Sequence, residues 1–162
     1  MASKTAGLTN LLTELVAANV EFVLVGGLAA VAQGAPISTV DVDIVHARSE
    51  DNLDRLMTLL TALHAQYRGR LGADPLPPSR DALAGPGHSL FQTDLGPLDC
   101  LGAIEQGLDY AALVPRSVGI ALGPGRVMVL GLETLIELKR QSSQRKDQLM
   151  LPALEATLAR RK

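Results

Sequence analysis

The chain of 162 residues is 47% hydrophobic and 20% charged, and its formal net charge is −2. A chain of this length and composition can bury a substantial core, so we expect residues 1–162 to form one folded domain, and a disordered segment is excluded. The negative net charge excludes bulk electrostatic capture of nucleic acid. The chain has two Phe, two Tyr and no Trp, which leaves few aromatic side chains on which bases could stack. We therefore expect no DNA partner.

The N-terminal residues carry no signal for export or membrane insertion. Met1-Ala2-Ser3-Lys4 is not followed by an apolar core of the signal-peptide type. No apolar stretch of the chain reaches the roughly eighteen residues that cross a bilayer. We therefore expect a cytoplasmic protein with no membrane partner.

A helix and a strand lead to a pair of glycines. Residues 7–19 place leucine and valine at helical spacing and predict the first helix, and the apolar run Phe22–Val25 predicts a short buried strand. The strand ends at Gly26-Gly27, and a short helix is expected to about Gln33. Backbone N–H groups at such a strand-to-helix turn can hold an anion.

Two aspartates lie on the next predicted strand, residues 40–45. Asp41 and Asp43 alternate with aliphatic residues, which indicates one wet and one buried face. Because residues i and i+2 of a strand point to the same face, both carboxylates should project together, about 6–7 Å apart at the backbone. The pair is a candidate cation site, and with the glycines it favours nucleotide chemistry.

The middle of the chain predicts one helix and one irregular segment. Ser49 reads as the N-cap of a helix with a buried leucine stripe to Leu63. Residues 68–87 are rich in Gly, Pro and Arg, and predict a loop. His46, at the end of the acidic strand, is interpreted as a surface histidine.

The second half predicts strands followed by helices. Residues 88–95 and 97–101 read as two strands joined near Gly96, and the second carries Asp99 between apolar neighbours. An acid in that setting is costly to bury without a partner, so we favour a functional role for Asp99. Cys100 is expected to face the buried side and to be inert, and no structural zinc is expected.

The C-terminal part predicts one more hairpin and two helices. Residues 117–122 and 127–130 read as a strand pair, residues 132–140 as a helix, and a last helix begins near residue 145, with Pro152 marking a kink or restart. The element order predicts an α/β or α+β domain, with a small mixed sheet flanked by helices.

These motifs together resemble the polymerase-β-type nucleotidyltransferase superfamily. The resemblance rests on Gly26-Gly27, on Asp41-Val42-Asp43 and on Leu98-Asp99-Cys100-Leu101, and it extends to the small prokaryotic branch near the AbiEii toxin and the minimal nucleotidyltransferases. Residues 132–140 followed by Arg145-Lys146-Asp147 are similar to the C-terminal pattern of that branch. The match covers about residues 8–150.

The resemblance implies a site for two Mg²⁺ ions and a nucleoside triphosphate. Asp41 and Asp43 would be paired metal ligands, and Asp99 the third ligand and a base for the incoming hydroxyl. The remaining candidates are nucleotide-binding: Gly26, Gly27 and Thr39, with Lys139 and Lys146 contacting phosphate and Asp147 fixing Lys146 or the helix start. Thr39 can also be interpreted as a strand residue that hydrogen-bonds locally. Lys139 can be interpreted as a cation that interacts favourably with the dipole at a helix C-terminus.

The implied activity is transfer of a nucleoside monophosphate to an acceptor hydroxyl, with the acceptor left open between RNA such as tRNA, a protein and a small molecule. A toxin–antitoxin context, with an antitoxin or a second copy of the chain as partner, is part of the same expectation. The chain departs from many relatives in having Gly26-Gly27 for Gly-Ser, and Ile37 where an arginine often stands. These departures keep open a non-catalytic nucleotide-binding or antitoxin-type protein, and a structural dimerisation module.

Overall fold

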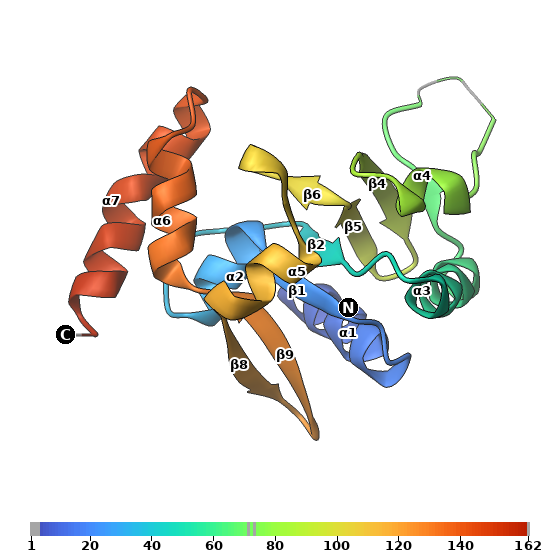
Figure 1. Cartoon of the computed structure of the whole chain (residues 1–162), viewed down its shortest axis with the longest axis horizontal. Helices are drawn as coiled ribbons and strands as arrows, with labels where there is room; N and C mark the ends of the chain where they lie inside the picture. The colour runs from blue at the N-terminus through green and yellow to red at the C-terminus, as the bar shows by residue number, and fades with distance from the viewer. Residues whose placement is uncertain (1–3, 71, 73, 162) are drawn as a thin grey trace.

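The structure is a computed structural model, and it describes residues 4–161 except Leu71 and Ala73. Expectations for residues 1–3, and for Leu71 and Ala73 of the predicted loop, lie outside the described residues. A seven-stranded sheet with the order β3-β4-β5-β2-β1-β9-β8 forms the centre of the molecule (Figure 1). Its strands are β1 Phe22–Val25, β2 Val42–His46, β3 Gln66–Tyr67, β4 His88–Thr93, β5 Gly96–Leu101, β8 Ser117–Leu122 and β9 Gly125–Leu130.

The sheet is mixed, as the sequence predicts. Strand β2 pairs antiparallel with β1 and parallel with β5, and β1 pairs parallel with β9. Strands β4 and β8 join as antiparallel hairpins to β5 and β9, and β3 pairs antiparallel with β4 at one edge of the sheet. The predicted fold class, a small mixed sheet flanked by helices, is therefore confirmed.

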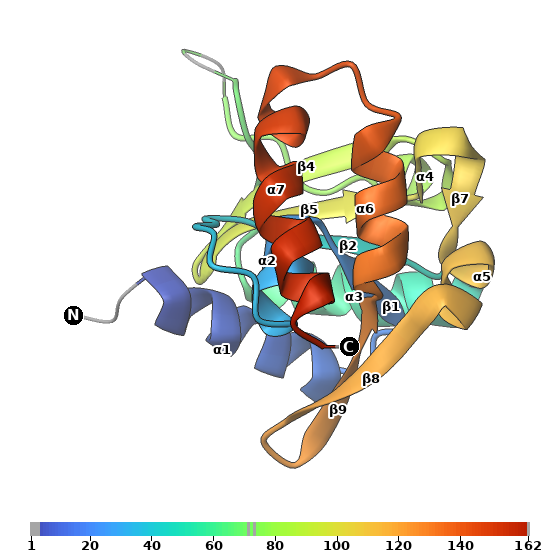
Figure 2. The same cartoon turned by 90° about the vertical axis from the view of Figure 1, so that its left-hand side faces the viewer.

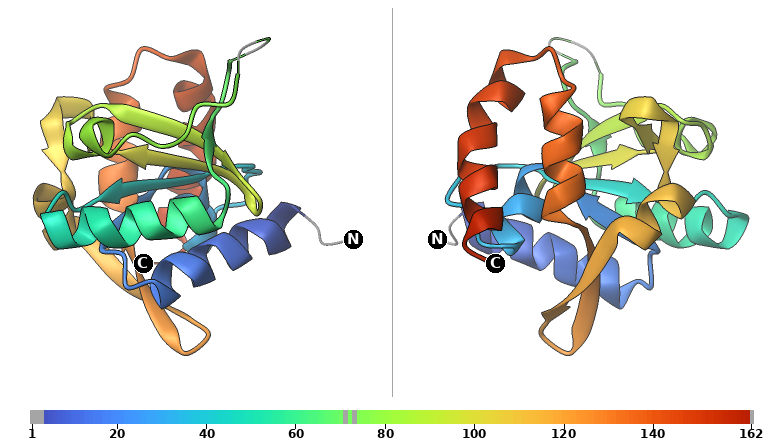
Figure 3. Two further views of the ribbon diagram at one scale, coloured as in Figure 1. Left: turned by 90° about the vertical axis from the view of Figure 1, so that its right-hand side faces the viewer. Right: turned by 60° about the vertical axis from the view of Figure 1, so that its left-hand side comes forward.

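Helices cover both faces of the sheet. Helices α1 and α3 contact each other on one face, and α6 and α7 run side by side on the other, with α2 between α6 and the sheet (Figures 2 and 3). None of the described helices is long and apolar enough to span a bilayer. The helices are α1 Lys4–Ala17, α2 Gly26–Ala32, α3 Glu50–Ala62, α4 Arg80–Ala84, α5 Tyr110–Leu113, α6 Leu132–Arg140 and α7 Arg145–Ala159.

The predicted leucine helix, α3, forms as its sequence indicates. Ser49 caps the helix, because its Oγ accepts a hydrogen bond from the backbone N–H of Asn52 at 3.3 Å. The leucine stripe of the helix is buried in the core through Leu53, Leu56, Leu59 and Leu60. Pattern and cap together therefore fix both the start of α3 and the face that it buries.

Several boundaries differ from the predictions. Strand β2 begins at Val42, so Asp41 lies just before the strand, and Gly96 already belongs to β5. Helix α7 continues through Pro152 without a break. The predicted loop at residues 68–87 contains α4, which Ser79 caps and which buries Leu83 completely, so the prediction of an irregular segment was wrong there.

Residues 102–116, for which the sequence predicted no element, form a small motif of their own. Strands β6 Ala103–Ile104 and β7 Leu108–Asp109 pair antiparallel around the 3-10 turn η1 Glu105–Gly107. A second 3-10 turn, η2 Val114–Arg116, leads into β8. These elements are two to four residues long, too short for a periodic pattern to predict them.

The interpretation of His46 as a surface residue was wrong. Its side chain is buried at the end of β2, and Nε2 donates a hydrogen bond to the backbone carbonyl of Leu83 in α4 at 2.8 Å. Burial lowers the pKa of His46, and the charge of Arg48 lowers it further. The neutral ring therefore connects α4 to the sheet.

A buried amide joins α3 to the loops at one end of the sheet. The side chain of Asn52 is 0% exposed, and its Oδ1 accepts from the backbone N–H of Glu21 at 2.7 Å. Its Nδ2 donates to the carbonyls of Glu21 and Ala47 at 3.0 Å and 2.7 Å. Two of the three bonds go to Glu21, which is distant in sequence, and the third goes to Ala47 just before the helix, so the amide orients α3 on the sheet.

The substitution Asn52→Asp should lower the free energy of unfolding by about 2–4 kcal/mol, because it leaves two buried carbonyls without a donor and brings a carboxylate close to them. Urea unfolding at neutral pH measures the effect. The matched control is Asn10→Asp on the exposed side of α1, which should change stability by less than about 0.5 kcal/mol. Equal effects of the two substitutions would contradict the anchoring role.

Candidate functional site

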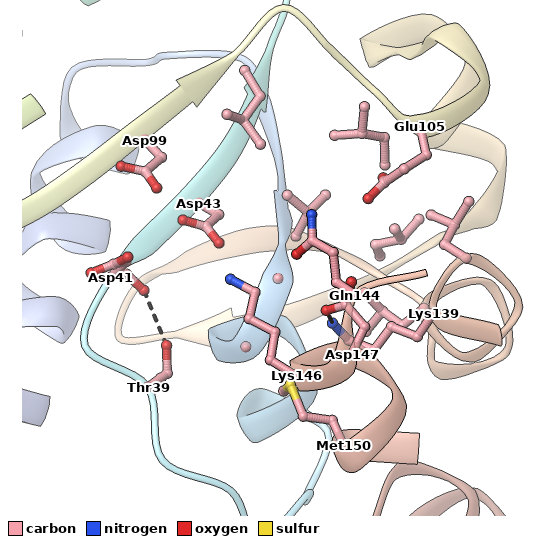
Figure 4. Close-up of a pocket in the computed structure, with 18 of the residues that line it drawn as sticks. Thr39, Asp41, Asp43, Asp99, Glu105, Lys139, Gln144, Lys146, Asp147 and Met150 are labelled. Carbon is pink, nitrogen blue, oxygen red and sulfur yellow. Dashed lines mark hydrogen bonds and ion pairs between the residues drawn. The ribbon is translucent and has the colours of Figure 1, made fainter. Parts of the chain in front are cut away.

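Three carboxylates converge above the centre of the sheet. The parallel pairing of β2 with β5 sets Asp43 opposite Asp99, and Asp41 precedes Asp43 by two residues on the same side. One oxygen of each of the three side chains lies within 4.8 Å of the others (Figure 4). The structure thus brings together the three residues that the sequence proposed as metal ligands.

The electrostatics of this cluster are dominated by Asp43. Burial raises the pKa of Asp43 to about 7, and a hydrogen bond to Asp99 and the charges of Asp99 and Asp41 act in the same direction. The charge of Arg68 opposes this rise. Among the described residues, the buried Oδ1 of Asp43 has no hydrogen-bond partner. Such a group is available to a proton or a cation.

Arg68 belongs to the site, and the sequence analysis did not identify it. Its Nη2 lies 2.7 Å from Oδ1 of Asp99, and its Nη1 donates to the carbonyl of Phe91 at 2.5 Å. Its backbone N–H also donates to the carbonyl of Leu90 at 2.9 Å. Three bonds therefore hold Arg68 in place next to β4 as the local counter-charge of the acids.

The two glycines are required by close contacts within the protein. Gly26 has φ +72°, and a Cβ on it would overlap the carboxylate of Asp43, with Cγ of that residue only 3.1 Å away. A Cβ on Gly27 would lie 3.0 Å from Oγ1 of Thr39. Thr39 in turn donates a long hydrogen bond of 3.4 Å to the carbonyl of Asp41. The glycine turn thus lies directly beside the acids.

Of the two roles predicted for Asp147, the pairing with Lys146 was wrong, and a role at the helix start stays a prediction. Asp147 accepts from Nζ of Lys139 at 3.0 Å and from Oγ of Ser142 at 2.6 Å, so it fixes Lys139 and not Lys146. Although burial raises the pKa of Asp147, the hydrogen bonds from Ser142 and Lys139 and the charges of Lys139 and Lys146 outweigh it and lower the pKa. This partly buried ion pair connects α6 to α7.

Lys146 is the other lysine of the site. Among the described residues it has no ion-pair partner within 4 Å, and its amino group points toward Asp41 and Asp43 (Figure 4). Ile37, where the sequence resemblance leads one to look for an arginine, packs against the hydrophobic core. Lys146 is therefore the cation that remains available to an anionic ligand.

The three acids, the glycine turn and the two lysines line one cavity of about 520 Å³ between the sheet and the α6–α7 pair, and Arg68 lies outside its lining. Its walls come from the β1–α2 turn, from β2, β4 and β5, from η1, and from α6 and α7. Cys100 is not part of it, because its thiol is completely buried, as predicted. The lining residues used below are Gly26, Gly27, Thr39, Asp41, Asp43, His88, Leu90, Asp99, Leu101, Ile104, Glu105, Lys139, Lys146 and Asp147.

No protein-family model and no curated protein matches the chain. Among solved structures, the lincosamide antibiotic adenylyltransferase LnuA with bound lincomycin has a TM-score of 0.62 at 13% identity, covering 93% of this chain and 96% of that one. ANT(2'')-Ia in complex with adenylyl-2''-tobramycin has a TM-score of 0.56 at 14% identity, covering 93% and 89%. An antigenic nucleotidyltransferase-like protein from Paracoccidioides brasiliensis has a TM-score of 0.52 at 16% identity, covering 96% and 75%.

These similarities show that the chain has the fold of the nucleotidyltransferases. They confirm the fold that the superfamily resemblance implied. The narrower resemblance to the AbiEii-toxin branch is not tested by them and stays a prediction.

The raised pKa of Asp43 predicts how stability depends on pH in the metal-free protein. Because the folded state holds this proton more tightly than the unfolded chain, the stabilisation is fully present below pH 3.8 and is lost as the pH rises through about 7. The loss amounts to about 4 kcal/mol at most. In EDTA, Asp43→Asn should therefore be more stable than the wild type at pH 8.

Urea unfolding at pH 5 and pH 8 measures this difference for the wild type and for Asp43→Asn. The control is Asp74→Asn, an exposed residue of the segment before α4, which should keep the wild-type dependence on pH. The same slope in all three proteins would show that Asp43 titrates normally.

Proposed function

We propose that the protein is a Mg²⁺-dependent nucleotidyltransferase, which moves a nucleoside monophosphate from a nucleoside triphosphate to an acceptor hydroxyl. The observation that carries this proposal is the convergence of Asp41, Asp43 and Asp99 within 4.8 Å, on a fold shared with nucleotidyltransferases. In the proposal, residues 1–162 act as one nucleotidyltransferase-like domain.

The three acids fit divalent cations by the chemistry of their donors. Mg²⁺ prefers carboxylate oxygens and leaves coordination positions for substrate phosphates. The buried Oδ1 of Asp43 lacks a hydrogen-bond partner among the described residues, so this oxygen is open to a cation. Two bound ions would stabilise the negative charge on the attacking and leaving oxygens.

In the proposed reaction, each residue of the site has a distinct role. Asp41 and Asp43 would hold the metal, and Asp99 would be the third ligand and would accept the proton of the attacking hydroxyl. That hydroxyl oxygen bonds to the α-phosphorus as the bond between this phosphorus and the bridging oxygen breaks, and pyrophosphate leaves. Lys146 and the backbone of Gly26 and Gly27 bind the triphosphate.

The neighbouring folds support the general reaction class. LnuA is described as a lincosamide antibiotic adenylyltransferase with bound lincomycin, and ANT(2'')-Ia in complex with adenylyl-2''-tobramycin, so both neighbours are associated with an antibiotic and an adenylyl group. The AbiEii-like branch, a toxin–antitoxin context, and an antitoxin or homodimer partner stay hypotheses from the sequence resemblance. A cytoplasmic location also stays a prediction.

The double substitution Asp41→Asn and Asp43→Asn should abolish nucleotide transfer, by at least about a thousandfold, because it removes two of three metal ligands. Transfer is measured with each labelled nucleoside triphosphate, Mg²⁺ and a cell extract as source of acceptors. The variant should remain folded, since the substitutions remove charge repulsion. The control is Asp74→Asn with Asp81→Asn, two exposed acids outside the cavity.

Undiminished transfer by the double variant would rule out this site. Calorimetry separates the proposal from a non-catalytic nucleotide-binding protein. Tight Mg²⁺-dependent binding of a nucleoside triphosphate by the wild type, without turnover on any acceptor, would favour the binding protein. A melting temperature that no nucleotide raises would favour a dimerisation module.

Lys146→Met should raise the KM for the nucleoside triphosphate about tenfold and change kcat less, because Lys146 is the available cation over the acids and its role is to bind phosphate. Steady-state kinetics at saturating Mg²⁺ measures both constants. The neighbouring Arg145→Met is the matched control, since Arg145 is exposed and does not line the cavity. A fall in kcat alone would argue against phosphate binding by Lys146.

A further inference from the structure

The order of the strands gives the cavity two chemically different ends. The glycine turn after β1 lies on one side of the acids, and β4 and the outer part of β5 lie on the other. In an in-line displacement the attacking and leaving oxygens are on opposite sides of the phosphorus. With the triphosphate at the glycine turn and Lys146, the acceptor must approach over β4 and β5.

The floor of this acceptor end is apolar. Leu90 is directly opposite Asp99 in the β4–β5 pair, Leu101 follows Asp99 by two residues, and all three face the cavity. Leu90 is 41% exposed although its strand lies inside the sheet. Ile104 continues the same surface. An uncovered leucine next to the proposed base fits contact with an apolar part of the acceptor.

The polar groups at this end are acidic or neutral. The carboxylate of Glu105 is exposed on η1, makes no hydrogen bond or ion pair with another described residue, and points into the cavity (Figure 4). Glu105 lies across the cavity from Asp99, where Leu101 and Ile104 lead from β5 to η1. His88 donates from Nε2 to the carbonyl of Ala103 at 2.9 Å. Glu105 is therefore a charge without an ion-pair partner, within the described residues, that faces the proposed base across the cavity.

The segment that carries Glu105 is held in place. Gln106 has φ +64°, and its side-chain amide donates to Oε1 of Gln141 at the C-terminus of α6. This bond fastens η1 to the opposite wall of the cavity. Glu105 is thus presented to the cavity by a fixed turn.

The same end is poorly suited to a nucleic acid. Within the described residues, no lysine or arginine lines the cavity next to β4 and the outer part of β5. Arg68 is outside the lining of the cavity, and its guanidinium pairs with Asp99 and donates to the carbonyl of Phe91. Among the residues that the structure describes, no Phe, Tyr or Trp lines the cavity. Phosphate contacts and stacking on aromatic rings are the main sources of affinity for RNA, and both are missing here.

We infer, resting on the proposed function, that the acceptor is a small hydroxyl-bearing amine with an apolar body, and that Glu105 selects it by binding the ammonium group. The apolar body lies on Leu90, Leu101 and Ile104, which directs the hydroxyl to Asp99. The hydroxyl oxygen takes the nucleotide and gives its proton to Asp99, and pyrophosphate leaves. The ammonium group does not react and keeps its proton.

The experiment compares three acceptor pools with the purified full chain, Mg²⁺ and each α-labelled nucleoside triphosphate. The first pool contains aliphatic amino alcohols and amino sugars, each beside the same molecule with the amine N-acetylated. The second is bulk tRNA, and the third a mixture of cytosolic proteins. We expect label in the amines, at least tenfold above their acetylated counterparts.

The variant Glu105→Gln then tests the residue itself. It should lower kcat/KM for the labelled amine at least tenfold and leave weak transfer to the acetylated counterpart unchanged within about threefold. Its rise in melting temperature with Mg²⁺ and nucleoside triphosphate should equal that of the wild type. Glu14→Gln, an exposed glutamate on α1, is the matched control.

Equal labelling of amines and acetylated molecules, label confined to tRNA or protein, or a Glu105→Gln variant that behaves like Glu14→Gln would each overturn this inference while leaving nucleotide transfer in place. Absence of label from all three pools, together with a melting temperature that nucleotide does not change, would overturn the proposed function as well.

Discussion

The parallel pairing of β2 with β5 is the constraint on which the site depends. It places Asp99 opposite Asp43, and the alternation of side chains then adds Asp41 to the same face. Three like charges at this distance oppose folding. The protein offsets part of this repulsion with the guanidinium of Arg68. Burial first, and then the hydrogen bond to Asp99 and the charges of the neighbouring acids, raise the pKa of Asp43. The fold thus holds together three carboxylates that one guanidinium only partly compensates.

The second element of the site is the helical pair that closes the cavity from above. The ion pair of Lys139 with Asp147, supported by Ser142, fixes the turn between α6 and α7. Lys139 is engaged in this ion pair. Lys146, the residue before Asp147, has no ion-pair partner among the described residues. Two lysines that look equivalent in the sequence therefore have different tasks, one structural and one directed at the cavity.

Much of the fold followed from local patterns, and what was missed depended on contacts distant in sequence. The alternation around Asp43, the cap at Ser49 and the apolar neighbours of Asp99 are each visible within six residues, so the sheet and the acidic cluster could be predicted. Arg68 reaches Asp99 only because β3 pairs with β4, a register that no local pattern contains. His46 is buried only because α4 covers it, and Glu105 was missed because the elements around it are too short to show periodicity.

The contact between Gly27 and Thr39 limits which residues position 27 can accept. The hydroxyl of Thr39 lies 3.0 Å from the point where a Cβ at position 27 would be. A hydroxyl beside the turn is thus supplied from the strand side and not from the helix. A side chain at position 27 fits only if Thr39 shifts or is replaced by a smaller residue, so the two positions should covary among homologues.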